Sequence, residues 1–416
     1  MEFCGANTCT QSLINSIKTN EKLYKTWKKS CSKKLPKGND TLHENYRIYR
    51  KKLRKLIKFA KSKFYCKKIS ENKGNHKKTW EILNQLRGKT QNVINSKFII
   101  DNKTVTNRRI IANEFNKYFT SIATNLNENL SCTGDGVPIS DLPNFDDFLP
   151  KSCNSTIFLY DCTQEEVGII ISELQNGKSS DIPIKIIKKA APKIVPLLVP
   201  YFNYFMSNGI FPDIIKNGRV SPIYKKDNAQ LIENYRPIST LPIFGKIFEK
   251  VIYSRLYSFL CSKNILYENQ FGFRKEHSTS HALNYSVSYI EEALNKQNHV
   301  LGIFLDLNKA FDTLDHNILL KKLYNYGIRG VAHNLLTSYL TDRTQYTSVL
   351  NENSETLFIK YGVPQGSVLG PLLFFIYIND ICNVSDLAKF VLFADDSNIF
   401  IQSTCKTELY RFANNF

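Results

Sequence analysis

The sequence predicts an α+β fold, in which helical segments and strands occupy different stretches of the chain. Two apolar segments, 304–307 and 392–396, are typical of strands, and each contains or ends on aspartate. Aspartate is uncommon in strands and costly to bury without compensation, so both segments need a functional reason. In the N-terminal part, apolar residues instead recur at helical spacing. Helices are therefore expected first and carboxylate-bearing strands later.

Residues 1–126 are predicted to form a basic helical region. An amphipathic helix is indicated by apolar residues at three- and four-residue spacing, namely Leu42, Tyr46, Tyr49, Leu53, Leu56, Ala60 and Phe64. A second periodic stretch predicts a core helix through Ile111, Phe115, Tyr118, Phe119, Ile122 and Leu126. The two helices differ in character, because the first carries cations on its other faces.

The positive charge is concentrated at the N-terminus. Residues 1–100 hold 25 Lys and Arg against 6 Asp and Glu, an excess equal to the net charge of +19 of the whole chain. A cationic helix can bind a phosphate backbone without reading sequence, which makes Arg47, Lys51, Arg54 and Lys58 candidate nucleic-acid-binding residues. A solvated helix face and contact with an anionic membrane surface are the alternatives.

Residues 127–158 are rich in Asn, Ser, Pro, Gly and Asp, and are predicted to be a linker. A second folded domain is expected over 159–416. Near its start, Thr163 to Glu166 has the spacing of a capping box and predicts a helix that stops near Asn176. The chain shows no apolar run of about 18 residues, no secretory signal, and no cysteine spacing typical of zinc or disulfides, which favours an intracellular protein.

The two carboxylate strands predict a divalent metal site. Asp306 ends the first, and Asp395 and Asp396 follow the second. Mg²⁺ prefers hard oxygen ligands, and paired metal ions held by carboxylates serve phosphoryl transfer. Aspartate also begins turns and caps helices, however, and Asp312 is a plausible helix start.

A family resemblance rests on three segments in this order: FLDLNKAFD (304–312), PQGSVLGPLLF (364–374) and FADD (393–396). They resemble three palm motifs of reverse transcriptases, and the wording is closest to jockey-like non-LTR retrotransposons. The resemblance implies a right-hand polymerase with fingers and an incomplete palm built on an antiparallel catalytic sheet. It also implies RNA-directed DNA synthesis from a primer 3′-hydroxyl, in the cytoplasm and nucleus. The partners implied are an RNA template, a DNA primer or target and deoxynucleotides, with no membrane and no stable protein partner.

In that family, the carboxylates that match Asp306, Asp395 and Asp396 hold two Mg²⁺ ions, with Mn²⁺ as the alternative. The residue matching Leu307 offers its backbone carbonyl to the metal. By the same match these residues are the expected catalytic and metal-binding set.

Other matches concern the nucleotide. Phe311 matches an aromatic steric gate that selects deoxynucleotides, the alternative being a core Phe at a helix start. Gln365 and Gly366 match residues that contact the incoming nucleotide and the template, and glycine permits a close backbone approach. Upstream, VSPIYKKD and NYRPIS resemble fingers motifs, in which Arg236 and Lys225 are expected to bind triphosphate. The following Ser367 is predicted to cap the next helix.

The segment QFGFR (270–274) resembles a further block of the family, expected near the template, and makes Arg274 a candidate for a template phosphate. The family's endonuclease, later palm motif and thumb find no match, so we expect a truncated chain with weak or no activity alone. The competing hypothesis is a non-catalytic nucleic-acid-binding remnant of a retroelement. A cellular or intron-type polymerase fits the motif wording less well.

Overall fold

The computed structural model describes residues 11–32, 39–72, 74–86, 97–129, 145–149, 152–176 and 180–414. The chain divides into two compact units, Met1–Val93 and Ile94–Phe416. This boundary precedes the one that the sequence suggested at residue 126. Much of the predicted linker, 130–144 and 150–151, lies outside the described residues.

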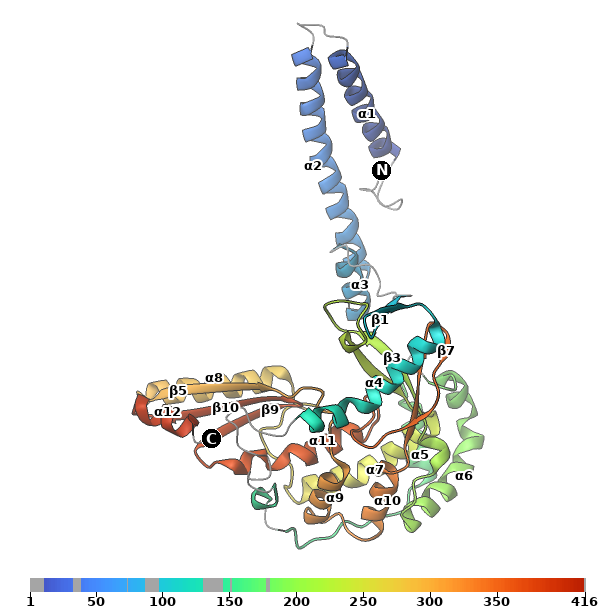
Figure 1. The fold of residues 1–416 in the computed structure, drawn as a ribbon, viewed down its shortest axis with the longest axis vertical. Helices are drawn as coiled ribbons and strands as arrows, with labels where there is room; N and C mark the ends of the chain where they lie inside the picture. The colour runs from blue at the N-terminus through green and yellow to red at the C-terminus, as the bar shows by residue number, and fades with distance from the viewer. Residues whose placement is uncertain are drawn as a thin grey trace. The chain divides into compact units, whose positions relative to one another are not determined.

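The first unit contains helices α1 (Gln11–Ser32), α2 (Asn39–Glu71) and α3 (His76–Leu86). Helices α1 and α2 lie side by side (Figure 1). The Trp27 ring of α1 stacks on Tyr46 of α2 with centroids 5.8 Å apart, and Leu53 is buried. The predicted amphipathic helix is confirmed within α2. Leu56 is an exception at 49% exposure, because one partner helix covers less than the full apolar stripe.

The second unit begins with a hairpin and a helix that pack on a five-stranded sheet. The hairpin is β1 (Phe98–Ile100) and β2 (Lys103–Val105), and the helix is α4 (Arg108–Asn129). The sheet has the order β4-β3-β6-β7, with β8 also paired to β6. Its strands are β3 (Gly218–Tyr224), β4 (Tyr235–Thr240), β6 (Thr344–Val349), β7 (Glu352–Asn353) and β8 (Leu357–Phe358).

Helix α4 belongs to this unit because its apolar face is buried against the sheet. Ile111 and Phe115 are fully buried and form one cluster with Val220 and Tyr235 of β3 and β4. The predicted core helix is thus confirmed. Its burial against these strands explains why the unit boundary lies ahead of residue 126.

A second sheet has three antiparallel strands in the order β5-β10-β9 (Figure 1). These are β5 (His299–Asp306), β9 (Ala388–Phe393) and β10 (Asp396–Ser403). Helices α8 (Thr279–Asn295) and α12 (Lys406–Asn414) contact it. Successive side chains of β9 alternate between two cores, because Phe390 and Leu392 join the main cluster whereas Val391 packs with Ala282 of α8.

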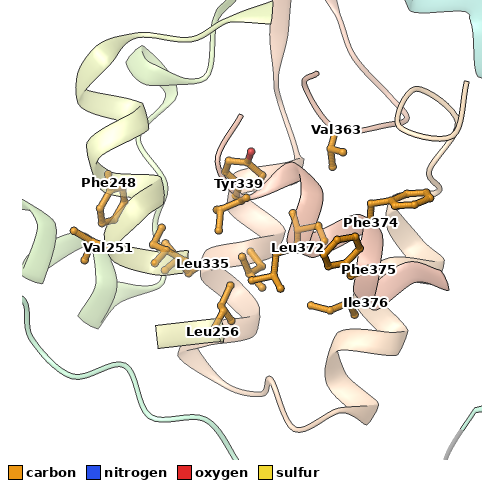
Figure 2. Close-up of a cluster of buried hydrophobic side chains, with 14 of the residues drawn as sticks. Phe248, Val251, Leu256, Leu335, Tyr339, Val363, Leu372, Phe374, Phe375 and Ile376 are labelled. Carbon is orange, nitrogen blue, oxygen red and sulfur yellow. The ribbon is translucent and has the colours of Figure 1, made fainter. Parts of the chain in front are cut away.

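The main hydrophobic core lies among the remaining helices. These are α5 (Gln164–Ser172), α6 (Ile184–Asn208), α7 (Ile243–Ser262), α9 (His316–Asn325), α10 (Val331–Leu340) and α11 (Gly370–Ile378). Short 3₁₀ turns are η2 (Phe145–Phe148), η3 (Asp213–Ile215), η4 (Ile232–Asn234) and η5 (Asn379–Val384). Figure 2 shows Phe248 of α7, Leu335 of α10 and Leu372 of α11 within this core. None of the helices in the described part of the chain has both the length and the apolar character that crossing a bilayer needs.

Helix α5 begins as predicted, because the Thr163 hydroxyl accepts from the Glu166 N–H at 3.2 Å. The helix ends at Ser172, before the predicted stop near Asn176. Glu166 forms an ion pair with Arg255 of α7, and Arg255 Nη2 donates to Glu166 Oε2 at 2.7 Å. The Arg255 side chain is 0% exposed, so this pair fixes α5 on α7 from within.

Replacing Arg255 by Met should destabilise the second unit by about 3 kcal/mol, because the Glu166 carboxylate and the carbonyls of Tyr160 and Asp161 would lose the donors of the fully buried guanidinium. The matched control is Lys296→Met, which removes an exposed ion pair with Glu292 on α8. That change should cost less than about 0.5 kcal/mol. Urea unfolding midpoints compare the two, and equal shifts would contradict the assignment of a structural role to the buried pair.

Candidate functional site

The three predicted carboxylates meet at one end of the β5-β10-β9 sheet. The β5–β10 register makes Asp306 and Asp396 direct cross-strand partners, and Ile303 pairs with Ile399 three residues further along. Asp395 lies in the turn that joins β9 to β10. Residues almost ninety positions apart in the sequence are thus neighbours because the apolar strands pair in this register.

Crowding of like charges marks this end of the sheet. The pKa of Asp396 is raised by burial and then by the charges of Asp395 and Asp306. A cation would relieve this repulsion, and carboxylate oxygens suit a hard divalent ion. In the described ranges, however, no three His, Cys, Asp or Glu side chains are already gathered as metal ligands. The carboxylate oxygens are therefore suitable ligands for a divalent ion. The strand register makes the backbones of Asp306 and Asp396 neighbours, but the three carboxyl groups do not converge on one point.

The turn before Asp395 is held by the segment QFGFR. Ala394 has a left-handed backbone, φ +59°, and its N–H donates to Gln270 Oε1 at 3.0 Å. Phe271 N–H donates to the Leu392 carbonyl at 2.8 Å. A Cβ on Gly272 would lie 2.3 Å from Ala394 N, so only glycine allows this approach. The predicted template block therefore lies against the carboxylate turn.

Arg274, the predicted template-phosphate residue, has one part of its guanidinium turned inward. Its Nη1 donates to the carbonyls of Tyr267 and Glu268 at 3.0 and 3.2 Å. This arrangement closes the loop that carries Gln270 and Gly272. Arg274 thus has a structural role, and its contact with a template phosphate stays a prediction.

The loop 362–369 forms hydrogen bonds with both the segment 304–312 and strand β4. Val363 N–H donates to the Phe311 carbonyl at 2.8 Å, and the Gln365 carbonyl accepts from Ser239 N–H at 2.8 Å. Gly366 has φ +121°, and a Cβ there would lie 2.6 Å from the Ser239 carbonyl oxygen. Glycine is therefore required where this loop touches β4.

Phe311 is half-buried, and its ring stacks on Phe374 of α11 with centroids 4.8 Å apart. The structure contradicts the alternative reading of Asp312 as a helix start. Helix α9 begins at His316, and its N-terminal N–H groups donate to the Asp315 carboxylate at 2.8 and 3.1 Å. Asp312 instead accepts a hydrogen bond from Gln365 Nε2 at 2.8 Å.

Lys225 and Arg236 lie on the β3–β4 hairpin. Arg236 pairs with Ile223, and Lys225 N–H donates to the Asn234 carbonyl at 2.9 Å. Since alternate residues share a face, both cations lie on the same, exposed face of the hairpin. Three residues after Arg236 on the same strand, Ser239 N–H donates to the Gln365 carbonyl. Strand β4 therefore carries Arg236 and also contacts the loop that contains Gln365.

Glu249 is a buried residue that the sequence did not single out. From α7, its Oε2 accepts from the N–H groups of Val368 and Leu369 at 2.5 and 3.3 Å, and its Oε1 accepts from the Tyr339 hydroxyl at 3.2 Å. Burial raises its pKa, which the charge of Arg343 partly offsets. A lone glutamate in a helix gives no signal in the sequence, yet this one holds the loop before α11.

The N-cap position of α11 is Leu369, which makes no side-chain capping bond, so the predicted capping role of Ser367 is wrong at that position. Ser367 instead closes the loop just before the helix. Its Oγ accepts from the Gly370 N–H at 3.0 Å and donates to the Pro364 carbonyl at 2.9 Å. The loop is therefore closed on itself as well as held by α7.

In the first unit, the candidate cations of α2 are all exposed. Arg47 forms an ion pair with Glu44 at 3.1 Å, on a surface where such pairs are weak. The residues Lys51, Arg54 and Lys58 follow along the same helix. Their exposure is compatible with contact to a polyanion.

Comparison with known proteins gives one family match and several relatives. The family described as reverse transcriptase (RNA-dependent DNA polymerase) matches residues 223–413. The probable RNA-directed DNA polymerase from transposon BS of Drosophila melanogaster is 34% identical over 235 residues, 54% of this chain and 26% of that protein.

Two further relatives belong to mobile elements of Drosophila. The RNA-directed DNA polymerase from mobile element jockey of Drosophila funebris is 32% identical over 257 residues, 59% of this chain and 28% of that protein. The probable RNA-directed DNA polymerase from transposon X-element of Drosophila melanogaster is 34% identical over 249 residues, 58% and 27% of the two chains. The chain therefore spans little more than a quarter of the length of these relatives.

The pH dependence of stability should report the environment of Asp312. Burial raises its pKa from 3.8 to about 6, against the opposing effects of the Gln365 hydrogen bond and the Lys309 charge. Because the pKa is higher in the folded state, Asp312 stabilises the fold below about pH 4, and this contribution is lost as the pH rises through 6. Asp312→Asn cannot ionise. Its stability relative to the unmodified chain should therefore increase from pH 4 to pH 7 by up to about 3 kcal/mol.

Thermal or urea unfolding at a series of pH values measures this difference. The same substitution at exposed Asp386 should leave stability nearly unchanged at every pH. A pH-independent difference between Asp312→Asn and the unmodified chain would show that the carboxyl of Asp312 is not buried as described.

Proposed function

Because residues 223–413 are a reverse transcriptase domain of the jockey-like non-LTR type, we propose that this chain carries the catalytic centre of an RNA-directed DNA polymerase. The reaction adds deoxynucleotides to a primer 3′-hydroxyl on an RNA template. The observation that carries the proposal is the β5–β10 register, which sets Asp306 opposite Asp396 beside Asp395.

Reverse transcriptases use divalent metal ions, and in this proposal Asp306, Asp395 and Asp396 hold two Mg²⁺ ions, with Mn²⁺ as the alternative. The backbone carbonyl of Leu307, the residue after β5, is the further proposed ligand. When bound, such ions offset the negative charge that develops during phosphoryl transfer. The pKa of Asp396 is raised first by burial and then by the charges of Asp395 and Asp306, and the mutual influence of these three carboxyl groups supports the set.

The remaining residues position the substrates. We assign the β3–β4 hairpin to the fingers, where Lys225 and Arg236 would bind triphosphate oxygens. The β5-β10-β9 sheet is the proposed palm. The Phe311 ring, fixed by stacking on Phe374, would exclude a ribose 2′-hydroxyl, and Gln365 and Gly366 would contact the incoming nucleotide and template.

A second function, nucleic-acid binding, is favoured by the exposed cations of α2. The proposed residues are Arg47, Lys51, Arg54 and Lys58, with Arg274 as a separate template contact. Binding of this kind depends steeply on salt, because each neutralised phosphate releases counterions. Metal-dependent nucleotide incorporation distinguishes a binding remnant from a polymerase, since the remnant would bind RNA yet incorporate no nucleotide.

Asp306→Asn and Asp395→Asn should each reduce Mg²⁺-dependent primer extension on an RNA template by at least about 100-fold, because each removes one charge from the proposed metal-binding set. The control Asp386→Asn lies on the turn before β9, is exposed, and should extend the primer normally. Extension that survives in Asp395→Asn would refute the metal-binding assignment. RNA binding without extension by the unmodified chain would favour the remnant.

Phe311→Val should increase ribonucleotide use relative to deoxynucleotide use by roughly 10-fold or more, because the smaller side chain leaves room for a 2′-hydroxyl. Single-nucleotide incorporation with matched ribo- and deoxynucleotides measures the ratio. As a control, Phe358→Ala removes an exposed ring (67% exposed) on β8 and should not change it. An unchanged ratio in Phe311→Val would assign Phe311 to the core alone.

A further inference from the structure

The side chain and the backbone of Gln365 are each held by a separate element. Its Nε2 donates to Asp312 Oδ2 at 2.8 Å, and its carbonyl accepts from Ser239 N–H of β4 at 2.8 Å. The neighbouring Gly366 touches Ser239 closely enough to forbid a Cβ. With the backbone fixed in this way, the remaining freedom of Gln365 is the rotation of its side-chain amide.

The chemistry of Asp312 removes that freedom. An ionised carboxylate only accepts hydrogen bonds, so the NH₂ end of the amide must face it. Although burial raises the pKa of Asp312 to about 6, the carboxyl remains mostly ionised at neutral pH. The amide oxygen Oε1 is therefore the end directed away from Asp312. Among the described residues, none donates a hydrogen bond to this oxygen.

Asp312 has no room to contact a nucleotide on its own side of the loop. The cavity there, which Asp312 lines together with Ser239, Tyr361 and Gln365, measures about 30 Å³. That volume suits about one water molecule, whereas ligand sites are typically roughly 300 Å³ or larger. The hydrogen bond to Gln365 is therefore the contact through which Asp312 would act on a bound nucleotide.

We propose that Asp312 is a positioning residue that orients the Gln365 amide, so that residue 365 presents a hydrogen-bond acceptor to the bound nucleotide or template. The inference rests on the proposed function, which places Gln365 beside those ligands. In this contact Gln365 accepts the hydrogen bond, so the ligand group that meets it must be a donor, either a hydroxyl or an amino group.

The first test needs no ligand. In ¹⁵N-labelled protein, the side-chain NH₂ signal of Gln365 is identified as the one that Gln365→Glu removes. In the unmodified chain, one of its two protons should be shifted by the hydrogen bond and exchange slowly with water. Both features should disappear in Asp312→Ala. An unchanged signal in Asp312→Ala would overturn the proposed orientation.

The second test is a double-mutant cycle in the equilibrium binding of deoxythymidine triphosphate. Asp312→Ala should weaken binding about 10-fold, which is the loss expected for one misplaced hydrogen bond. Gln365→Ala should weaken it at least as much, and the double variant should bind no more weakly than Gln365→Ala. Asp312→Asn, whose side-chain oxygen can still accept from Gln365, should recover most of the affinity.

Additive losses in the double variant would overturn the proposal, because Asp312 would then act independently of Gln365. Failure of the unmodified chain to bind deoxythymidine triphosphate would count against the proposed function. The NH₂ signal would still decide whether Asp312 orients Gln365. The two failures are therefore distinguishable.

Discussion

Asp306 and Asp396 are cross-strand partners at the end of the β5–β10 ladder, and the surrounding structure must keep these two like charges on neighbouring strands. Like charges directly opposite in a sheet are destabilising, and Asp395 adds a third. The paired residues Ile303 and Ile399 pack in the main hydrophobic core, and this burial supplies the stabilisation. The repulsion among these aspartates therefore reduces the stability of the fold locally, and the hydrophobic core of the second unit offsets that loss.

The segments around this sheet end are fixed by backbone contacts at sites that only glycine can occupy. Gly272 lies against the Ala394 turn, and Gly366 lies against Ser239 of β4. Glu249 adds a buried acceptor for the two amides ahead of α11. Together these contacts join the five-stranded sheet, the β5-β10-β9 sheet and the helical core.

Local pattern predicted the carboxylate strands, the α4 helix and the start of α5, because each has a periodicity or a cap that acts within a few residues. It did not predict the α4 assignment to the second unit, which depends on burial against strands about a hundred residues or more away. Asp315 rather than Asp312 caps α9, a difference that the sequence does not reveal because neighbouring aspartates look equivalent in it. Glu249 was missed because its partners are backbone amides, which leave no trace in residue identity.

Strand β5 has a consequence for the behaviour of the protein in solution. Among the described strands it pairs only with β10, which leaves its other side as a free edge of eight residues. Phe304 and Leu305 on this strand are 71% and 42% exposed. An unprotected apolar edge is a template for intermolecular pairing. The β5 edge therefore favours self-association at high concentration, and a charged or proline residue placed on it would oppose that pairing.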